Sequence, residues 1–243
     1  HSLLYRLWVR QDVVFEPHSR IQNRLLFQQH INGRRLRLLW GYDDGWSKRA
    51  MNREVEMIDG SRATMWDALV AGVEAAHGPL ALGVHAAGVL GIAPILDMAP
   101  QEWDRVMGVN ATGTFNVTRA FGWAMARQGR GAIVAVSSNA AGIPRLNMGA
   151  YAASKAAATM LVRCLGLELA AQGVRCNIVA PGSTLTPMQT GMWAEDGGAG
   201  ERAVIEGSLE AYRTGIPLKK LATPEDIAGA VMFLLSDQAG HVT

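Results

Sequence analysis

From residue 64 onward the chain alternates helix-type and strand-type hydrophobic patterns. Four segments carry apolar residues three to four positions apart and are predicted helices: residues 64–78, 99–129, 151–173 and 223–237. Three short apolar runs separate them and are typical of strands buried on both faces of a parallel sheet: residues 80–88, 131–138 and 174–182. This alternation predicts an α/β fold built on a doubly wound parallel sheet.

One uncharged stretch, residues 75–96, is long enough to raise the question of a membrane span. It contains four Gly, two Pro and two His, and Asp97 follows it directly. Because these residues interrupt an apolar helix, we expect a buried strand followed by a loop and no membrane partner. A second stretch, residues 194–203, is rich in glycine and charge, and we expect a mobile loop there.

Length and composition fit one soluble domain over residues 1–243, because 243 residues are too few for two comfortable α/β domains. The net charge of +2 gives no general reason to expect a nucleic-acid partner. Cys164 and Cys176 suggest no disulfide framework and no signal peptide is visible, so the sequence predicts a cytoplasmic protein. The six histidines are scattered, and we therefore predict no metal site.

Tyr151 and Lys155 are the first candidates for chemistry, because their spacing puts both side chains on one helical face. Taken alone, they could be an accidental pair on a solvated helix. The residues between and after them are Ala, Ser and Thr, which suit a helix packed closely against another surface. Ser138 ends one predicted strand and Pro181-Gly182 ends the next, at the edge where α/β sheets place functional groups. We therefore expect these residues to meet in one crevice.

The residue types fit an alcohol oxidation. A tyrosine hydroxyl titrates near ~10, and a partly shielded lysine ammonium beside it would lower that pKa toward neutrality. Ser138 would hold and polarise a substrate oxygen. Tyr151 could then remove the alcohol proton while a hydride leaves for a cofactor.

These motifs resemble the short-chain dehydrogenase/reductase family. Ser138 stands thirteen residues before the YAASK motif of residues 151–155, and APGST follows at 180–184. HAAG at 85–88 is similar to the Asn-Ala-Ala-Gly strand end of the family, and VNATGTFNV at 109–117 is similar to its central helix. The resemblance covers about residues 59–243 and implies one Rossmann-type NAD(P)-binding domain.

The resemblance also implies roles for individual residues. The catalytic tetrad would be Asn110, Ser138, Tyr151 and Lys155. Asp43, at the end of a second strand over residues 38–44, would bond the adenosine ribose and favour NAD over NADP, and Asp59 would contact adenine. The full set implied to bind NAD is Asp43, Asp59, His85, Ala86, Ala87, Gly88, Tyr151, Lys155, Pro181, Gly182, Thr184 and Thr186. His85 stands where the family usually has Asn, and a neutral His could still form a hydrogen bond there.

Residues 140–157, 167–193 and 212–243 more narrowly resemble the family members that oxidise 2,3-dihydro-2,3-dihydroxybenzoate with NAD in catecholate siderophore biosynthesis. The resemblance implies a small-molecule substrate, a cyclic diol carboxylate bound by Ser138. Arg145 could bind the carboxylate through two parallel hydrogen bonds, or it could be an ordinary surface arginine. Met188 and Gln189 could close over the ring, or they could be ordinary loop packing.

The N-terminal part departs from the family pattern. Family members begin with a strand, a Gly-rich phosphate loop and a helix, but residues 1–59 contain only Gly33, Gly41 and Gly45, none at phosphate-loop spacing. Residues 1–37 instead hold seven Arg against two acids. We hypothesise that this segment is a frame-shifted or mis-assigned reading of a normal nucleotide-binding segment. The alternative is a divergent N-terminus with impaired cofactor binding.

Other functions stay open at this point. Within the family, the chain could be a 3-oxoacyl or sugar-alcohol reductase. Outside it, a chain with a damaged cofactor site could be a non-catalytic scaffold, or the Arg-rich segment could contact nucleic acid. The resemblance further implies a homo-oligomer, a tetramer or a dimer, although the family's last strand is missing after residue 243.

Overall fold

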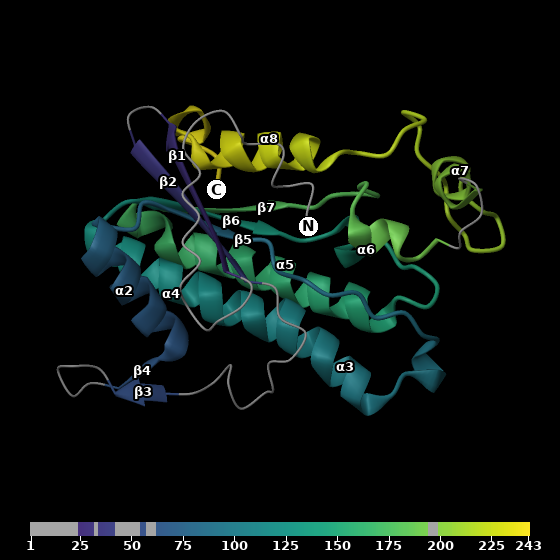
Figure 1. Ribbon diagram of the computed structural model, residues 1–243, viewed down its shortest axis with the longest axis horizontal. Coiled ribbons are helices and arrows are strands. Elements are labelled where there is room, and N and C mark those ends of the chain that lie inside the picture. The colour runs from purple at the N-terminus through teal and green to yellow at the C-terminus, as the bar shows by residue number, and fades with distance from the viewer. Residues whose placement is uncertain (1–23, 32–33, 42–53, 57–61, 194–198) are drawn as a thin grey trace.

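The computed structural model describes residues 24–31, 34–41, 54–56, 62–193 and 199–243, with side-chain surroundings from residue 66 onward. Its strands are β1 (Arg24–Ile31), β2 (Arg34–Gly41), β3 (Glu54–Glu56), β4 (Arg62–Thr64), β5 (Leu82–His85), β6 (Gly131–Val136) and β7 (Val174–Val179). Its helices are α2 (Met65–His77), α3 (Pro100–Met107), α4 (Gly113–Gln128), α5 (Gly149–Leu169), α6 (Pro187–Thr190), α7 (Ala199–Glu206) and α8 (Pro224–Leu235) (Figure 1).

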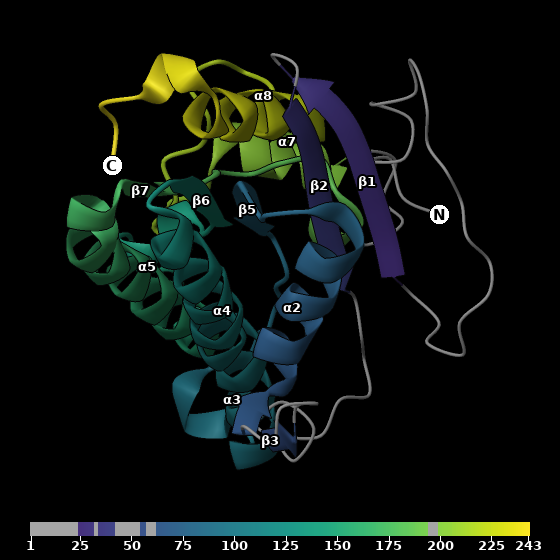
Figure 2. The same cartoon turned by 90° about the vertical axis from the view of Figure 1, so that its left-hand side faces the viewer.

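The centre of the fold is a parallel sheet with the strand order β5-β6-β7. The connection from β5 to β6 passes through α3 and α4, and the connection from β6 to β7 passes through α5. Helices α4 and α5 cover one face of this sheet and α8 covers the other (Figures 1 and 2). The predicted α/β fold with helices on both faces of a parallel sheet is therefore confirmed.

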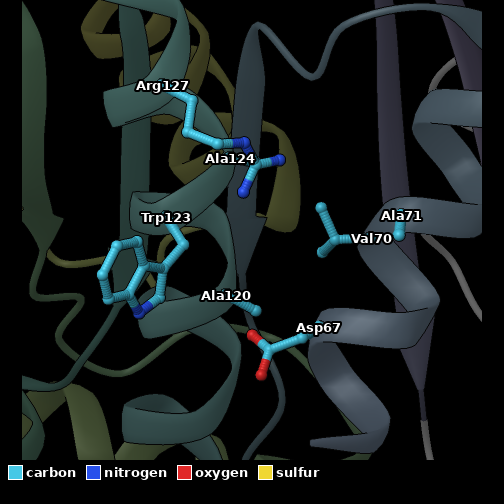
Figure 3. Close-up of a pocket in the computed structure, with 7 residues that line it drawn as sticks. All are labelled: Asp67, Val70, Ala71, Ala120, Trp123, Ala124 and Arg127. Atoms are coloured by element: carbon cyan, nitrogen blue, oxygen red, sulfur yellow. The ribbon is translucent and has the colours of Figure 1, made fainter. Parts of the chain in front are cut away.

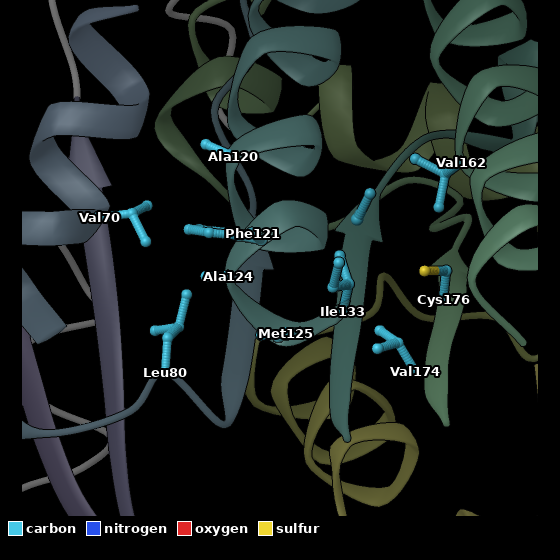
Figure 4. Close-up of a cluster of buried hydrophobic side chains, with 11 residues drawn as sticks. Val70, Leu80, Ala120, Phe121, Ala124, Met125, Ile133, Val162, Val174 and Cys176 are labelled. Atoms are coloured by element: carbon cyan, nitrogen blue, oxygen red, sulfur yellow. The ribbon is translucent and has the colours of Figure 1, made fainter. Parts of the chain in front are cut away.

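Strand β6 is buried on both faces, as its continuous apolar sequence predicts. Ile133 and Ala135 belong to the cluster with α2, α4, α5 and β7 (Figure 4). Ala132 and Val134 belong to the cluster with α8. All four side chains are at most 4% exposed. Alternating side chains of a strand point to opposite faces, so this one strand contributes to both halves of the core.

The predicted helix over 99–129 is not one regular α-helix. A π-helical turn, Gly108–Thr112, separates α3 from α4. Such turns widen the helix by one residue and occur frequently at functional sites. This one contains Asn110, which the sequence could not place on an irregular turn because its apolar spacing continues on both sides.

Two other boundaries differ from the sequence prediction. Helix α5 begins at Gly149, two residues before Tyr151. The stretch 194–203 is not entirely a loop, because α7 begins at Ala199, while residues 194–198 lie outside the described residues.

The described N-terminal strands do not extend the parallel sheet. Residues 34–41 form β2, which pairs with β1 in an antiparallel two-stranded sheet, so the expectation of a family-type second strand at 38–44 is wrong for this part. Only two residues of sequence separate β1 from β2, and such a short connection can join antiparallel but not parallel neighbours. Strand β2 nevertheless lies beside β5 (Figure 2).

The apolar stretch 75–96 holds the end of α2, strand β5 and the loop after it, as predicted. Within the part of the chain that the structure describes, no helix is both long and apolar enough to cross a membrane.

Helix α8 begins with a capping box that the sequence signals. The Thr223 hydroxyl accepts a hydrogen bond from the Asp226 amide at 3.2 Å, and the Asp226 carboxylate accepts one from the Thr223 amide at 2.8 Å. Loss of an N-cap side chain leaves a helix amide without its partner. We expect Thr223→Ala to lower the free energy of unfolding by about 1 kcal/mol, measured by urea denaturation. Thr223→Ser, which keeps the hydroxyl, is the matched control, and equal losses in both variants would contradict this role.

Candidate active site

Ser138 lies at the carboxyl edge of the sheet because the backbone around it continues the pairing of β6 with β7. The Ser137 amide donates to Val179 O at 2.8 Å, and the Asn139 amide donates to Pro181 O at 2.9 Å. The Ser138 hydroxyl accepts a hydrogen bond from the Ala140 amide at 3.2 Å. The side chain is therefore fixed at the end of a buried strand, where the sequence predicted it.

Tyr151 lies in the first turn of α5, is 8% exposed, and forms a side-chain hydrogen bond with Ser138. Burial raises the pKa of Tyr151 above that of a free tyrosine, and the Ser138 hydrogen bond offsets part of this rise. The expectation that Lys155 lowers this pKa is therefore wrong for the protein alone. The Lys155 ammonium lies 5.9 Å from the centre of the tyrosine ring and donates its hydrogen bond elsewhere.

Lys155 is a nearly buried cation, 6% exposed. Its Nζ donates to Val136 O at 3.0 Å, and it forms no salt bridge with any described carboxylate. Burial lowers the pKa of Lys155 to about 8, because the charged form loses its water without gaining an acid. An ammonium has three N–H donors, so this group has donors left for a ligand.

Gly88 brings the loop after β5 close to Lys155. A Cβ atom at this position would lie 3.1 Å from Lys155 Nζ and 3.4 Å from Asn110 Oδ1. Any larger residue would crowd both groups, so the HAAG motif of 85–88 is part of the same edge as Tyr151 and Lys155.

Asn110 joins the loop after β5 to α5. Its Oδ1 accepts from the Val89 amide at 2.8 Å, and its Nδ2 donates to Val89 O and to Ser154 Oγ, each at 2.9 Å. The side chain is 1% exposed and fully engaged. In the protein alone Asn110 therefore holds the site together and does not reach into open space.

His85 is a buried neutral histidine. The Thr114 hydroxyl donates to Asn110 O at 2.6 Å and lies 3.3 Å from His85 Nδ1. Since that hydroxyl proton is already donated, His85 Nδ1 carries the proton in this contact, which leaves Nε2 as an acceptor. Burial, and secondarily the Lys155 charge, lowers the pKa of His85 to about 4, which agrees with the predicted neutral form.

The segment after β7 completes the same edge. Thr184 Oγ1 donates to Gly182 O at 3.3 Å, and Thr186 caps α6 by accepting from the Gln189 amide. Together with Lys155 and its spare donors, these groups fit the nicotinamide and ribose half of a dinucleotide. Ala86, Ala87 and Pro181 lie in the loops at this edge, but their contacts with a cofactor stay predictions. Asp43 and Asp59 lie outside the described residues.

The side chains predicted to bind the substrate differ in how deeply they are buried. Gln189 is 9% exposed, and its Nε2 is buried with no hydrogen-bond acceptor among the residues that the structure describes. Met188 is 41% exposed, and Arg145 is half-buried. Burial lowers the pKa of Arg145, and the positive charge of Arg213 lowers it further. Arg213 lies in the stretch 212–243 that resembles other family members, but nothing in that stretch indicates that its charge acts on Arg145.

A separate cavity of about 140 Å³ lies between α2 and α4 (Figure 3). It contains none of the predicted site residues and is lined by Asp67, Val70, Ala71, Ala120, Trp123, Ala124 and Arg127. Over the described residues, no three His, Cys, Asp or Glu side chains are grouped so that they could hold a metal ion.

The parallel sheet, with a serine, a tyrosine, a lysine and an asparagine gathered at its carboxyl edge, defines a Rossmann-type dehydrogenase. A family model described as enoyl-(acyl carrier protein) reductase matches residues 47–243. The chain is 53% identical over 177 residues to the 2,3-dihydro-2,3-dihydroxybenzoate dehydrogenase of Bacillus subtilis, covering 73% of this chain and 67% of that protein. The chain belongs to the short-chain dehydrogenase/reductase family.

Further relatives agree with this assignment. The vibriobactin-specific 2,3-dihydro-2,3-dihydroxybenzoate dehydrogenase of Vibrio cholerae is 48% identical over 160 residues, covering 66% of this chain and 60% of that protein. A solved 7α-hydroxysteroid dehydrogenase in complex with NADH and 7-oxo glycochenodeoxycholic acid matches with a TM-score of 0.64 and 30% identity, covering 73% of this chain and 65% of that one. The chain thus spans 60% to 67% of the length of these curated relatives. Residues 1–46 fall outside the family match.

Proposed function

We propose that this protein oxidises 2,3-dihydro-2,3-dihydroxybenzoate with NAD to 2,3-dihydroxybenzoate, a step of catecholate siderophore biosynthesis. One observation carries the proposal: the hydrogen-bonded pair Ser138 and Tyr151 lies beside the buried Lys155 ammonium, which has spare donors and no salt bridge to any carboxylate that the structure describes. The named activity of the relatives from Bacillus subtilis and Vibrio cholerae supports the choice of substrate.

Ser138 and Tyr151 would perform the proton chemistry. The Ser138 hydroxyl orients the oxygen of the ring alcohol, and Tyr151 Oη takes the proton of that alcohol as the general base. NAD, when bound, accepts the hydride from the alcohol carbon. The C–H and O–H bonds break as the C=O bond forms. The resulting ring ketone then gives up one ring proton to solvent while its oxygen takes one up, and this rearrangement yields the aromatic diol.

Lys155 and Asn110 would prepare the site for that step. The Lys155 ammonium would donate to the ribose hydroxyls of the nicotinamide half, and its charge would favour a tyrosinate formed next to it. Asn110 would keep the loop after β5 and helix α5 at the right separation through its three side-chain hydrogen bonds. Asp43 and Asp59 would hold the adenosine half.

The substrate side supplies hydrogen-bond donors. Arg145 would pair with the substrate carboxylate, and the buried Gln189 Nε2, which has no acceptor in the protein alone, would donate to a substrate or cofactor oxygen. Met188 would cover the apolar face of the ring. An unsatisfied buried donor costs stability in the free protein, which is a reason to expect a ligand oxygen there.

The test is NADH formation from NAD and 2,3-dihydro-2,3-dihydroxybenzoate, with identification of 2,3-dihydroxybenzoate as the product. The comparison substrates are a 3-hydroxyacyl thioester and a sugar alcohol, which the other dehydrogenases of this family would take. We expect turnover of the diol acid to exceed that of both alternatives. Turnover of the thioester alone would indicate an acyl reductase instead. NAD binding without turnover of any of these compounds would contradict the proposed choice of substrate.

The assembly and compartment are also proposals. The outer faces of α4 and α5 expose large apolar side chains, namely Phe115, Trp123, Met160 and Leu167, and a second copy of the chain would bury them in a dimer or tetramer. Light scattering on a sizing column tests this, and a monomer at micromolar concentration would overturn it. Both cysteines are free, which fits the reducing cytoplasm.

The nature of the N-terminal segment is tested by intact mass and N-terminal peptide sequencing of the isolated protein. The hypothesis of a frame-shifted or mis-assigned segment requires that the protein lacks the peptide HSRIQNRLLF of residues 18–27. A protein that carries this peptide has a divergent N-terminus, and its affinity for NAD then decides whether it works as an enzyme.

A further inference from the structure

Ser154 is a buried polar side chain in the site to which the proposed reaction gives no role. It lies on α5 between Tyr151 and Lys155 and is 0% exposed. Its Oγ donates to Tyr151 O at 2.7 Å and accepts from Asn110 Nδ2 at 2.9 Å. A hydroxyl has one proton to donate, so the proton goes to α5 itself and a lone pair serves the π-helical turn that contains Asn110. Ser154 therefore joins two segments that each carry a member of the predicted tetrad.

The Asn110 amide group has no simple replacement for this partner. Its Oδ1 accepts from the Val89 amide, and its Nδ2 donates one proton to Val89 O and the other to Ser154 Oγ. Turning the amide toward another acceptor would break both bonds with Val89, and at 1% exposure the side chain has little access to water. Without the Ser154 hydroxyl, either one buried donor stays unpaired or the π-helical turn shifts relative to α5.

The first turn of α5 is held by few other side chains. Met148, the N-cap residue of the helix, forms no side-chain capping bond. The end of β6 holds α5 further along, because Ser137 Oγ lies 3.3 Å from Lys155 O and 2.6 Å from Thr159 Oγ1. Among the residues that the structure describes, the only side-chain hydrogen bond to the backbone of the first turn comes from Ser154.

The position of this first turn sets the separation of the Tyr151 and Ser138 hydroxyls. Ser138 is fixed independently of α5, because its neighbours pair through their backbones with the end of β7 and the segment after it. The hydrogen bond between Tyr151 and Ser138 therefore requires that α5 and the end of β6 keep their separation. Displacement of a reacting group by about 1 Å can lower a rate by about 100-fold.

We propose that Ser154 is a positioning residue, whose hydroxyl ties the first turn of α5 to Asn110 and so keeps Tyr151 within reach of Ser138 and of the reacting alcohol. The inference rests on the proposed function for the roles of Tyr151 and Ser138. It goes further in assigning part of the rate to a fully buried side chain that acts only through its neighbours.

The test compares Ser154→Ala with Thr118→Val. Thr118 is also 0% exposed, and its hydroxyl donates to Thr114 O at 2.7 Å within α4, with no bond to another element among the described residues. We expect Ser154→Ala to lower kcat for the diol acid by about 10- to 100-fold with little change in KM. Thr118→Val should leave kcat nearly unchanged. Urea denaturation of both variants shows whether their losses of stability are similar, so that instability alone does not explain a difference in kcat.

A second measurement does not depend on turnover. The ionisation of Tyr151 is followed by the ultraviolet absorbance of tyrosinate, after subtraction of the titration of the same protein with Tyr151→Phe. The hydrogen bond from Ser138 offsets part of the rise in the pKa of Tyr151 that burial causes. Ser154→Ala should weaken this bond and shift the ionisation to higher pH, whereas Thr118→Val should not.

Ser154→Thr provides a rescue, because a threonine in a helix can bond through its hydroxyl to the carbonyl three residues earlier. It should recover most of the kcat lost in Ser154→Ala. A Ser154→Thr protein that is as stable as the original and yet as slow as Ser154→Ala would contradict the role of the hydroxyl.

The outcomes separate the positioning role from the proposed activity. Equal kcat and equal Tyr151 ionisation in Ser154→Ala and Thr118→Val would overturn the positioning role, even if the diol acid is turned over. A shifted ionisation in Ser154→Ala alone, in a protein that does not oxidise the diol acid, would support the positioning role and overturn the proposed activity.

Discussion

Tyr151→Phe is expected to lower kcat for oxidation of the diol acid by about 10²- to 10⁴-fold, the range that loss of a general base typically gives. Phenylalanine has the same shape without the hydroxyl, so the 8% exposed ring keeps its packing in the first turn of α5. The variant loses only the hydrogen bond with Ser138. We expect the free energy of unfolding to change by no more than about 1 kcal/mol, because one neutral hydrogen bond is worth about that much.

The measurement is the single-turnover rate of NADH formation, together with NAD affinity and urea denaturation of the same sample. Unchanged NAD affinity with a lost rate assigns the hydroxyl to the chemical step. Tyr212→Phe is the control, because that hydroxyl belongs to an exposed side chain outside the site. A Tyr151→Phe protein that retains a tenth or more of the rate would show that another group takes the proton.

Lys155→Met is expected to lower kcat/KM by about 10²- to 10³-fold, the scale of losing one fixed charged donor in an active site. It should at the same time raise stability at pH 7. Burial lowers the pKa of Lys155 from 10.5 to about 8, so keeping this group charged in the folded state costs on the order of 3 kcal/mol. Methionine fills a similar volume without a charge, and we expect a gain of about 1 to 3 kcal/mol after the lost hydrogen bond to Val136 is included.

The stability gain of Lys155→Met is expected to depend on pH, and the pKa of Lys155 sets the direction of that dependence. Between pH 8 and 10.5 the unfolded chain binds a proton at Lys155 that the folded protein has released. Unfolding takes up this proton, so the contribution of Lys155 to stability rises with pH across that window and its cost is fully present below it. The stability gain of Lys155→Met should therefore be largest below pH 8 and should shrink toward pH 10.5.

The check is urea denaturation of both proteins at pH 7, 8, 9 and 10 with activity measured in parallel. Arg163→Met, on the exposed side of the same helix, is the control. A Lys155→Met protein that is less stable than the original at pH 7 would mean that the ammonium is better solvated than its burial indicates. Activity retained in Lys155→Met would show that the Lys155 side chain is not needed for the reaction.

Several parts of this molecule follow from short-range sequence signals. The spacing of Tyr151 and Lys155 puts both on one helical face, and Ser138 lies at the end of an apolar run. Thr223 and Asp226 indicate where α8 begins. These signals are reliable because helical periodicity, strand burial and capping depend on residues within a few positions of each other. The comparisons with relatives support the family and substrate predictions that these motifs carry.

Local sequence patterns did not predict other features of the fold and of the site. The antiparallel pairing of β1 with β2 was not predicted, although Asn32-Gly33, the dipeptide between them in the sequence, is typical of hairpin turns. The π-helical turn at Asn110 left no visible break in the apolar spacing of its helix. Asp43 and Asp59 stay predictions, because the structure does not describe them.

The sequence by itself therefore determined which residue types are available for hydride and proton chemistry and at which edge of a parallel sheet they gather. Only the tertiary structure decided their electrostatic state. Burial, which depends on packing across the whole domain, raises the pKa of Tyr151 and keeps His85 neutral. The charge of Arg213 acts on Arg145 from a loop far along the chain, and no local pattern encodes this interaction, because its energy depends on distance and solvent exposure in the folded protein.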